Sequence, residues 1–365
     1  MKVALVGVGQ AGGKLTQALA ENDYRMGFDA VKSALAVNTA KADLTSLDLD
    51  TVLIGQSTVK GHGVGGDNEL GAEVMQEDAK EVMNALDGRI TTQAEAIMVV
   101  AGLGGGTGSG GAPVLVKELR RIYDLPVYAV GILPGRNEGT MYQVNAGRSV
   151  KTVIREADAT ILIDNDAWHE SGESVREGFD AINGAIARRL GLLLAAGEFD
   201  AGDVVAESVV DSSEIINTLR KGGVASLGYA TAELGEDSAM NVNAVTSVVR
   251  KALLTNTSLP DAVEADAALV VAAGPIDHIP RKGVERARKW VQEQTKSMEV
   301  RGGDFPVDSE KVAAIVLLGG VERSERVQEF LERASEAQAE MAQEPTQGSA
   351  DPAAPFQSDE LEDLF

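Results

Sequence analysis

The decisive stretch of this sequence is Gly104-Gly105-Gly106-Thr107-Gly108-Ser109-Gly110. It follows an apolar run, residues 96–101, that has the length and composition of a buried strand. It precedes residues 113–119, where a proline opens a predicted helix. Glycines in this context let backbone N–H groups close around phosphate oxygens, and the helix N-terminus adds partial positive charge. A flexible linker is the alternative, but the flanking strand and helix favour a phosphate-binding loop.

The composition of the 365 residues is acidic and poor in aromatic side chains. Asp and Glu number 56 against 33 Lys and Arg, the formal net charge is -23, and aromatic residues make up 4%. This length accommodates about two domains, with a core built mostly from small aliphatic residues. The negative charge argues against nucleic acid or an anionic membrane as the main partner. It is typical of a salt-adapted, halophilic protein, and an ordinary acidic protein is the alternative.

Residue types needed for several other kinds of site are missing or scattered. Cysteine is absent, which excludes disulfides and a thiolate nucleophile. The three histidines, His62, His169 and His278, are far apart in sequence, so we expect no zinc site. We find no signal peptide and no membrane-spanning apolar run, and we expect a soluble cytoplasmic protein that reaches the cell envelope only through partners.

A second glycine-rich turn lies near the start of the chain. Residues 2–6 predict a strand, and Gly7-Val8-Gly9-Gln10-Ala11-Gly12-Gly13-Lys14 fits the dinucleotide pattern G-x-G-x-x-G. A nicotinamide site would need an acidic residue after the next strand, residues 34–37, but Asn38 stands there. A P-loop would need Ser or Thr where Leu15 stands. We therefore expect this loop to bind phosphate or ribose in a third way.

Further predicted strands end in polar or glycine-rich loops. Strands at residues 51–54, 127–133 and 160–163 are followed by such loops, and helical stretches separate them. This alternation predicts a parallel sheet with helices on both faces, and ligands bind beyond the carboxyl ends of its strands. Several glycine loops at one edge indicate a polyphosphate ligand. His62 lies in one of them, where a turn residue is favoured over a general acid.

Two residue pairs in the middle of the chain have both a structural and a functional interpretation. Phe179 and Asn183 lie one turn apart on a long predicted helix, residues 175–196. Phe179 either packs in the core or stacks on a purine, whose edge Asn183 would bind. Asp211 and Glu214 precede a helical run, where an N-cap is the ordinary interpretation.

The character of the sequence changes after Gly222. Strands at residues 224–230, 267–273 and 312–318 and helices at 242–254 and 282–297 predict a second, mixed α/β domain without phosphate loops. A cluster of basic residues in this domain forms either a solvated face or a contact for an acidic partner. The cluster consists of Arg281, Lys282, Arg286, Arg288 and Lys289. From about Ser335 we expect a disordered acidic tail. Its end is either frayed or a partner anchor formed by Leu361, Leu364 and Phe365.

Taken together, these motifs resemble the tubulin/FtsZ superfamily collinearly from Met1 to about Arg333. Residues 104–110 resemble its signature loop, and residues 9–12 resemble the first nucleotide loop of tubulins. The resemblance implies a Rossmann-like parallel-sheet GTPase domain over residues 1–173 and a long central helix over 174–197. It also implies a catalytic loop with its following helix over 198–221, a mixed α/β domain over 222–334 and a disordered acidic tail over 335–365.

The same resemblance implies GTP or GDP as the ligand, with Mg²⁺ held by phosphates and water and Gln10 as a candidate side-chain ligand. Glu138 matches a ribose contact, Asn165 a guanine contact, and Phe179 with Asn183 the pair that stacks on and binds the base. The implied nucleotide-binding residues are Gly9, Gln10, Ala11, Gly12, Lys14, Asn38, Gly63, Val64, Gly65, Gly66, Gly104, Gly105, Gly106, Thr107, Gly108, Ser109, Gly110, Glu138, Asn165, Phe179 and Asn183.

Asp211 and Glu214 match the catalytic loop of the superfamily, which enters the nucleotide site of the next subunit. The resemblance therefore implies a head-to-tail homopolymer that hydrolyses GTP at its interfaces. Val209 and Tyr142 depart from the pattern, at the places of an Asn and of an FtsZ Arg. The mixture of tubulin-like and FtsZ-like loops most resembles the haloarchaeal CetZ family, associated with cell shape. The alternatives are an FtsZ-type division protein, a nucleotide sensor without hydrolysis and a Rossmann-type NAD-dependent oxidoreductase.

Overall fold

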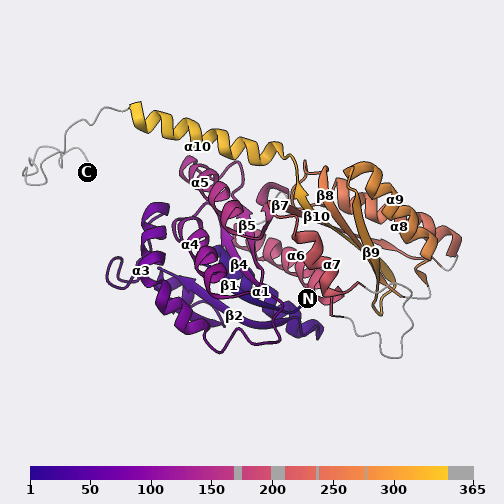
Figure 1. The fold of residues 1–365 in the computed structure, drawn as a ribbon, viewed down its shortest axis with the longest axis horizontal. Helices are drawn as coiled ribbons and strands as arrows, with labels where there is room; N and C mark the ends of the chain where they lie inside the picture. The colour runs from indigo at the N-terminus through magenta and orange to yellow at the C-terminus, as the bar shows by residue number, and fades with distance from the viewer. Residues whose placement is uncertain (168–174, 199–209, 236–237, 276–277, 344–365) are drawn as a thin grey trace, which may run out of the picture.

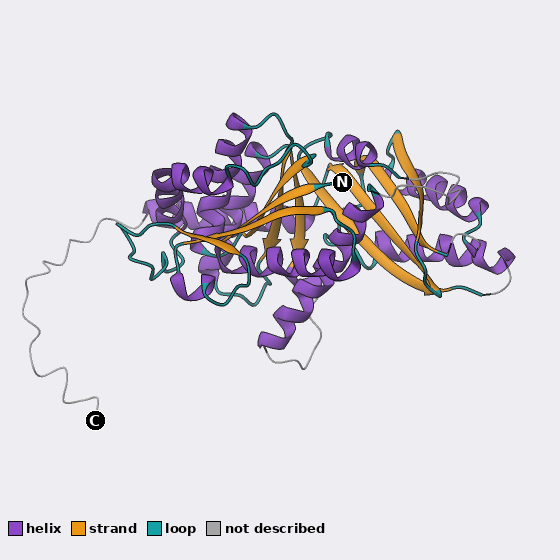
Figure 2. Cartoon of the chain, turned by 90° about the horizontal axis from the view of Figure 1, so that it is seen from below, coloured by secondary structure: helices purple, strands orange, loops and turns teal. Residues whose placement is uncertain are grey.

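A computed structural model describes residues 1–167, 175–198, 210–235, 238–275 and 278–343. Within these residues a single ten-stranded sheet runs through the molecule in the order β3-β2-β1-β4-β5-β6-β7-β10-β8-β9. Figure 1 shows the two halves of the chain at opposite ends of this sheet, and Figure 2 shows helices on either side of the strands. No helix in the described part of the chain combines the length and apolar character needed to cross a bilayer.

The first six strands are all parallel, as the alternation of strands and helices predicts. Pairing of β1 with β4 places Val3 beside Ala96 and Val8 beside Ala101. Alternate residues of β1 face opposite layers, since Val3 and Leu5 pack with α1 and α6 whereas Val6 and Val8 pack with α3 and α4. The strands are β1 (Val3–Val8), β2 (Val31–Asn38), β3 (Asp50–Leu53), β4 (Ala96–Gly102), β5 (Val127–Leu133) and β6 (Ala159–Asp164).

Helices cover both faces of this parallel half. One face carries α1 (Gly9–Met26) and the long central helix α6 (Val175–Ala196), and α7 (Ser212–Leu219) follows along the chain. The other face carries α3 (Asn68–Leu86), α4 (Gly106–Ile122) and α5 (Thr140–Glu156). Two short elements, α2 (Lys41–Leu44) and the 3-10 turn η1 (Asn165–Ala167), follow the ends of β2 and β6.

The second half of the sheet is mixed, as predicted from the sequence after Gly222, but it continues the first half without a break. β7 (Val224–Glu233) pairs with β6 in parallel at only two positions. β10 (Lys311–Val321) is antiparallel to both β7 and β8 (Ala265–Gly274). α8 (Ser238–Leu254) and α9 (Arg281–Thr295) pack on one face of this half.

Two elements at the C-terminal end differ from the sequence prediction. β9 (Glu299–Pro306) is an edge strand that we did not predict, because Gly302 and Gly303 lack the β-branched side chains typical of strands. α10 (Glu325–Gln343) continues past Ser335, where we expected disorder to begin. It lies along α5 (Figure 1), and this packing stabilises a helix whose Ala, Gln and Glu are good helix formers. Leu361, Leu364 and Phe365 lie outside the described residues.

The glycine stretch also has a different boundary from the one expected. α4 begins at Gly106, with Gly105 at the N-cap, so the second half of the stretch is already helical and Pro113 lies inside the helix. Proline has no N–H to donate to the carbonyl of Ser109, four residues earlier. The Ser149 hydroxyl of α5 donates to that carbonyl instead, at 2.7 Å. A partner from another helix thus makes the internal proline tolerable.

Gly110 sets how closely α3 and α4 approach, which gives a testable prediction. A Cβ at Gly110 would lie 1.9 Å from the Asn68 carbonyl oxygen of α3. Gly110→Ala is therefore expected to cost about 1–3 kcal/mol or more of unfolding free energy. The matched control is Gly184→Ala in α6, where the nearest atom, Arg188 Nη1, is 3.6 Å away. This change should stabilise by about 0.5–1 kcal/mol. Chemical denaturation measures both, and equal stability of Gly110→Ala and wild type would contradict the packing described.

Candidate functional site

A cavity of about 470 Å³ lies at the carboxyl ends of the parallel strands. This is the edge at which the polar loops were expected to converge. Loops after β1, β2, β4, β5 and β6 all contribute to its lining. The predicted residues that line it are Gly9, Gln10, Ala11, Lys14, Asn38, Gly63, Val64, Gly65, Gly66, Gly104, Gly105, Gly106, Thr107, Gly108, Glu138, Asn165 and Asn183.

One end of the cavity has the features of an anion site. α1 begins at Gly9 and α4 begins at Gly106, and both residues line the cavity, so two helix N-termini contribute partial positive charge there. Lys14 adds a full positive charge. A Cβ on Gly105, which also lines the cavity, would meet no protein atom within 4 Å. Neither backbone strain nor packing requires a glycine at this position, so the open space beside Gly105 is room for a ligand.

Hydrogen bonds between loops fix the shape of this end. The hydroxyls of Thr39 and Thr107 lie 2.7 Å apart and link the loop after β2 to the glycine stretch. Asn145 of α5 donates from Nδ2 to the carbonyl oxygens of Gly66 at 2.7 Å and of Gly104 at 3.0 Å. One buried amide therefore holds two glycine-rich loops together. Asn145 was not among the predicted site residues, although its place between Val144 and Ala146 of a helix is a signal that could have revealed it.

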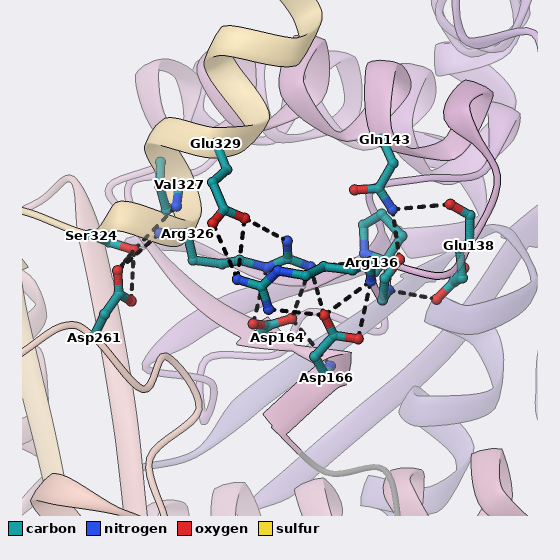
Figure 3. A network of polar contacts seen from close by, with 12 residues as sticks. Arg136, Glu138, Gln143, Asp164, Asp166, Asp261, Ser324, Arg326, Val327 and Glu329 are labelled. Carbon is teal, nitrogen blue, oxygen red and sulfur yellow. Dashed lines mark hydrogen bonds and ion pairs between the residues drawn. The ribbon is translucent and has the colours of Figure 1, made fainter.

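The other end of the cavity is built from the loops after β5 and β6. Glu138 Oε1 accepts hydrogen bonds from the Gly135 N–H at 2.8 Å and from Asn165 Nδ2 at 3.4 Å. Figure 3 shows Glu138 beside the polar network that continues from this loop. The residues expected to contact ribose and base thus lie side by side. Asn183 of α6 lines the same cavity, whereas the side chain of Phe179, one turn earlier, lies outside the described residues.

Asp211 and Glu214 lie at the opposite edge of the sheet from the cavity. Ser212, between them, donates through its hydroxyl to Glu95 Oε1 at 2.5 Å, and Glu95 directly precedes β4. The cavity lies where β4 ends, seven residues further on, which is roughly 20 Å at about 3.3 Å per residue. The pair therefore cannot contact a ligand in the cavity of its own chain.

Comparison with known proteins decides the family. Residues 2–173 match the family model of the Tubulin/FtsZ family, GTPase domain, and residues 172–336 match that of the tubulin-like CetZ C-terminal domain. The chain is 65% identical to the tubulin-like protein CetZ2 of Haloferax volcanii over 365 residues, all of both chains. This chain belongs to the CetZ family of tubulin-like proteins.

Solved structures agree with this assignment. A structure of CetZ2 from Haloferax volcanii, described as a GTPγS-bound protofilament, matches with a TM-score of 0.90, covering 94% of this chain and 100% of the other. CetZ1 from the same organism, described as a GDP-bound monomer, is 52% identical with a TM-score of 0.86, covering 93% and 100%. An FtsZ from M. jannaschii is 22% identical with a TM-score of 0.69 over 88% of each chain and shares the fold.

Membership of the CetZ family excludes two of the alternatives that the sequence left open. The chain carries a GTPase domain of the tubulin/FtsZ type, so a Rossmann-type NAD-dependent oxidoreductase is wrong. An FtsZ-type division protein is a distant relative rather than the match. The mixture of tubulin-like and FtsZ-like loops was therefore a correct guide to the family.

Three predicted nucleotide contacts have a packing role in this member of the CetZ family. A Cβ on Gly12 would lie 2.2 Å from the Val100 carbonyl oxygen, so this glycine allows α1 to pack against β4. Gly110 allows the close packing of α4 on α3 described above. The Ser109 hydroxyl donates back into its own helix, to the Gly106 carbonyl oxygen at 3.3 Å. None of the three lines the cavity described here; Gly12 lies inside α1, and Ser109 and Gly110 lie inside α4, which starts earlier than the sequence suggested.

The cavity is also lined by residues that were not among the predicted nucleotide contacts. Asp43 of α2 accepts hydrogen bonds from Gln10 Nε2 and Asn38 Nδ2, both at 3.0 Å. Tyr142, noted above as a departure from the FtsZ pattern, lines the cavity. His62 is exposed at the rim, where a bridge pairs it with Ala40, in keeping with a turn residue. The other lining residues are Val8, Ala40, Gly102, Ile132, Pro134 and Ile182, and Val209 lies outside the described residues.

The pKa values of the Asp211 and Glu214 carboxyls shift in opposite directions. Asp211 caps α7, since its Oδ1 accepts from the Glu214 N–H at 3.1 Å and from the Ser213 hydroxyl at 2.5 Å. The Ser213 hydrogen bond lowers the pKa of Asp211. Burial raises the pKa of Glu214, and the neighbouring Asp211 charge raises it further. The N-cap interpretation is therefore correct, and it leaves the Glu214 carboxyl free of that role.

Proposed function

We propose that this chain is a cytoskeletal GTPase whose subunits stack head to tail, so that Asp211 and Glu214 of one subunit complete the cavity of the next. The placement of the cavity and the carboxylate pair at opposite edges of the sheet carries this proposal. A single chain holds both halves of an active site but cannot bring them together. Translation of one copy along the strand direction would place the pair of one subunit over the cavity of its neighbour.

Features of the relatives support GTP as the ligand and a polymer as the active form. The CetZ2 structure described as a GTPγS-bound protofilament shares 65% of its sequence with this chain. In the cavity, the two helix N-termini and Lys14 suit the phosphates, and Glu138 and Asn165 suit ribose and base. The nucleotide-sensing alternative would need no carboxylate pair at the opposite edge.

Asp211 and Glu214 would act by positioning a water molecule. Hydrolysis needs a water in line with the γ-phosphate and stabilisation of charge around the phosphoryl group. Ionised Glu214 can orient and polarise this water, while Asp211 fixes the start of α7 and so the direction of Glu214. The backbone N–H groups of the glycine stretch meet the phosphate oxygens.

The cavity also contains side chains that suit Mg²⁺, which prefers a few carboxylate or amide oxygens together with phosphates and water. Gln10 and Asp43 supply such oxygens, and they are hydrogen bonded to each other. The described residues contain no cluster of three or more acidic or histidine side chains that would hold a metal ion alone. We therefore infer that Mg²⁺, which neutralises phosphate charge when bound, is held mainly by the nucleotide with Gln10 and Asp43 beside it.

The raised pKa of Glu214 predicts a pH dependence of turnover. Because Glu214 must be ionised to orient water, kcat should fall on acidification at a pH above the ordinary range of a glutamate, while Asp211 stays ionised. Steady-state GTP turnover across mildly acidic to neutral pH, at fixed salt and saturating GTP, measures this. A flat profile down to the ordinary glutamate pKa would contradict it.

The same shift predicts an effect on stability. The folded state holds the Glu214 proton more tightly than the unfolded chain, so stability falls as pH rises from the unfolded pKa through the raised folded pKa. Glu214→Gln removes this loss and is expected to raise Tm at neutral pH. The difference from wild type should shrink as pH falls into that window. A lower Tm for Glu214→Gln at neutral pH would show that the ionised carboxylate is stabilising.

The proposal is tested by GTP turnover as a function of protein concentration in molar potassium salt. A steep concentration threshold is expected, because only assembled subunits have complete sites. Turnover proportional to concentration would indicate a self-contained enzyme, and no turnover would indicate a sensor.

We further propose a role in cell shape in the cytoplasm and, through partners of the tail residues Leu361, Leu364 and Phe365, at the envelope. A division-site ring in cells would contradict the shape role.

A further inference from the structure

A polar network connects the C-terminal helix α10 to the base-and-ribose end of the cavity. Figure 3 shows Arg326 reaching from α10 to the loops that follow β5 and β6. Its Nε donates to Asp164 Oδ2 at 3.1 Å, and its Nη2 donates to the Pro134 carbonyl oxygen at 2.9 Å and to Asp166 Oδ2 at 3.2 Å. One guanidinium therefore ties together the ends of two neighbouring strands.

Burial makes these contacts specific. Arg326 and Asp164 are each 3% exposed, so neither charge is compensated by water. The face of the guanidinium lies over the Phe330 ring, 4.4 Å from its centroid, and Nη1 donates to Glu329 Oε2 at 3.1 Å. A lysine could carry the charge but could not make the forked contacts to a carboxylate and a carbonyl at once.

A second arginine of α10 supports the same loop. Arg333 Nη1 donates to Gln143 Oε1 at 3.1 Å, and Gln143 Nε2 donates to the carbonyl oxygens of Gly135 at 2.6 Å and of Glu138 at 3.2 Å. Arg333 follows Arg326 by seven residues, two turns on the same face of the helix. The loop that carries Glu138 is thus held at both ends from α10.

Close packing keeps α10 in this position. Gly147 of α5 faces the helix, and a Cβ there would lie 2.2 Å from the Phe330 carbonyl oxygen. The Phe330 side chain is fully buried in the core of the first half of the sheet. α10 therefore belongs to the GTPase half structurally, although its residues follow the second half in sequence.

We propose that Arg326 and Arg333 are positioning residues for the nucleotide, acting through the loops that present Glu138 and Asn165. This inference rests on the proposed function, because it assumes that a nucleotide binds in the cavity. Of the loops that line the cavity, Arg326 bonds those at the base-and-ribose end, and Arg333 reaches the same end through Gln143 of α5. The glycine-rich loops at the phosphate end are held instead by Thr39 and Asn145. Loss of either arginine should therefore weaken recognition of the nucleoside and leave recognition of a phosphate chain unchanged.

Binding of GDP and of inorganic tripolyphosphate, measured by calorimetry in molar potassium salt, tests this proposal. Arg326→Lys and Arg326→Gln are expected to weaken GDP binding by about 10- to 100-fold, the effect of losing charge-assisted hydrogen bonds. Arg333→Gln, which leaves the buried ion pair intact, is expected to weaken it by a few-fold. Tripolyphosphate binding should stay within about twofold of wild type in all three.

The matched control is Ser324→Ala at the start of α10. The Ser324 hydroxyl bonds Asp261 at 3.1 Å and touches neither loop, so this variant loosens the helix without the proposed effect. GDP affinity at the wild-type level in folded Arg333→Gln and Arg326→Lys would overturn the proposal. An equal loss for tripolyphosphate, or the same loss in Ser324→Ala, would also overturn it by showing general destabilisation. Failure of the wild type to bind GDP would instead refute the proposed function, and this inference with it.

Discussion

Glu214→Gln is expected to lower GTP turnover by about two to four orders of magnitude, the usual contribution of a group that handles water in the transition state. GTP binding should be unchanged, because Glu214 lies at the opposite edge of the sheet from the cavity of its own chain. Filaments should accumulate, since subunits can still assemble with GTP but cannot hydrolyse it. Turnover, nucleotide affinity and sedimentation of polymer measure the three effects.

A matched control separates this effect from a loss of surface charge. Glu118→Gln on α4 removes a partly buried carboxylate that pairs with Arg121 and should leave turnover at the wild-type level. Normal hydrolysis by dilute Glu214→Gln monomers would show that catalysis needs no residue from a neighbour. A parallel loss of GTP affinity would show that Glu214 acts on binding instead.

Gly105→Ala is expected to weaken nucleotide binding strongly while leaving the fold intact. Gly105 has φ -76° and ψ 169°, a conformation open to any residue, and an added Cβ would meet no protein atom within 4 Å. The methyl group would instead enter the cavity where backbone N–H groups must approach phosphate oxygens. The methyl group would push the phosphate away from these N–H groups and break several hydrogen bonds to a charged ligand. Nucleotide affinity should therefore fall by about 100-fold or more.

Gly139→Ala is the matched control for Gly105→Ala. Gly139 also has open space for a Cβ and a negative φ, and it caps α5 in the way that Gly105 caps α4, but it does not line the cavity. Its substitution should preserve both Tm and GDP affinity. If Gly105→Ala bound GDP as well as Gly139→Ala does, the glycine stretch would not be the phosphate site. Thermal denaturation confirms that both variants fold.

The fold was predictable where short-range patterns specify it. Apolar runs followed by polar loops predicted the parallel half, since a buried parallel strand needs little beyond aliphatic side chains. Long-range contacts explain the failures. In α4 the Ser109 carbonyl, which Pro113 cannot pair, is satisfied by Ser149 of another helix, and β9 pairs with β8 although its own residues are poor strand formers. α10 packs on α5, an element far from it in sequence.

The site residues that could be predicted are those that lie in the loops directly after the strands. Gly104–Gly108, Gly63–Gly66, Glu138 and Asn165 were expected at one sheet edge, and they line one cavity. Asn145 and Arg326 were missed because each acts across the fold, from helices far from the loops in sequence. The residues that hold the loops in place thus lie in helices whose sequences give no sign of a binding site.

Mixing the two variants tests the central claim that one active site is shared between two subunits. Glu214→Gln keeps an intact cavity but lacks the catalytic carboxylate, whereas Gly105→Ala keeps the carboxylate but lacks a functional cavity. Neither should hydrolyse GTP alone. Because the Glu214 of a Gly105→Ala subunit can complete the cavity of a Glu214→Gln neighbour, the account predicts that the mixture recovers turnover well above the sum of its parts. Turnover in the mixture no higher than that sum, with both variants folded, would contradict a shared site.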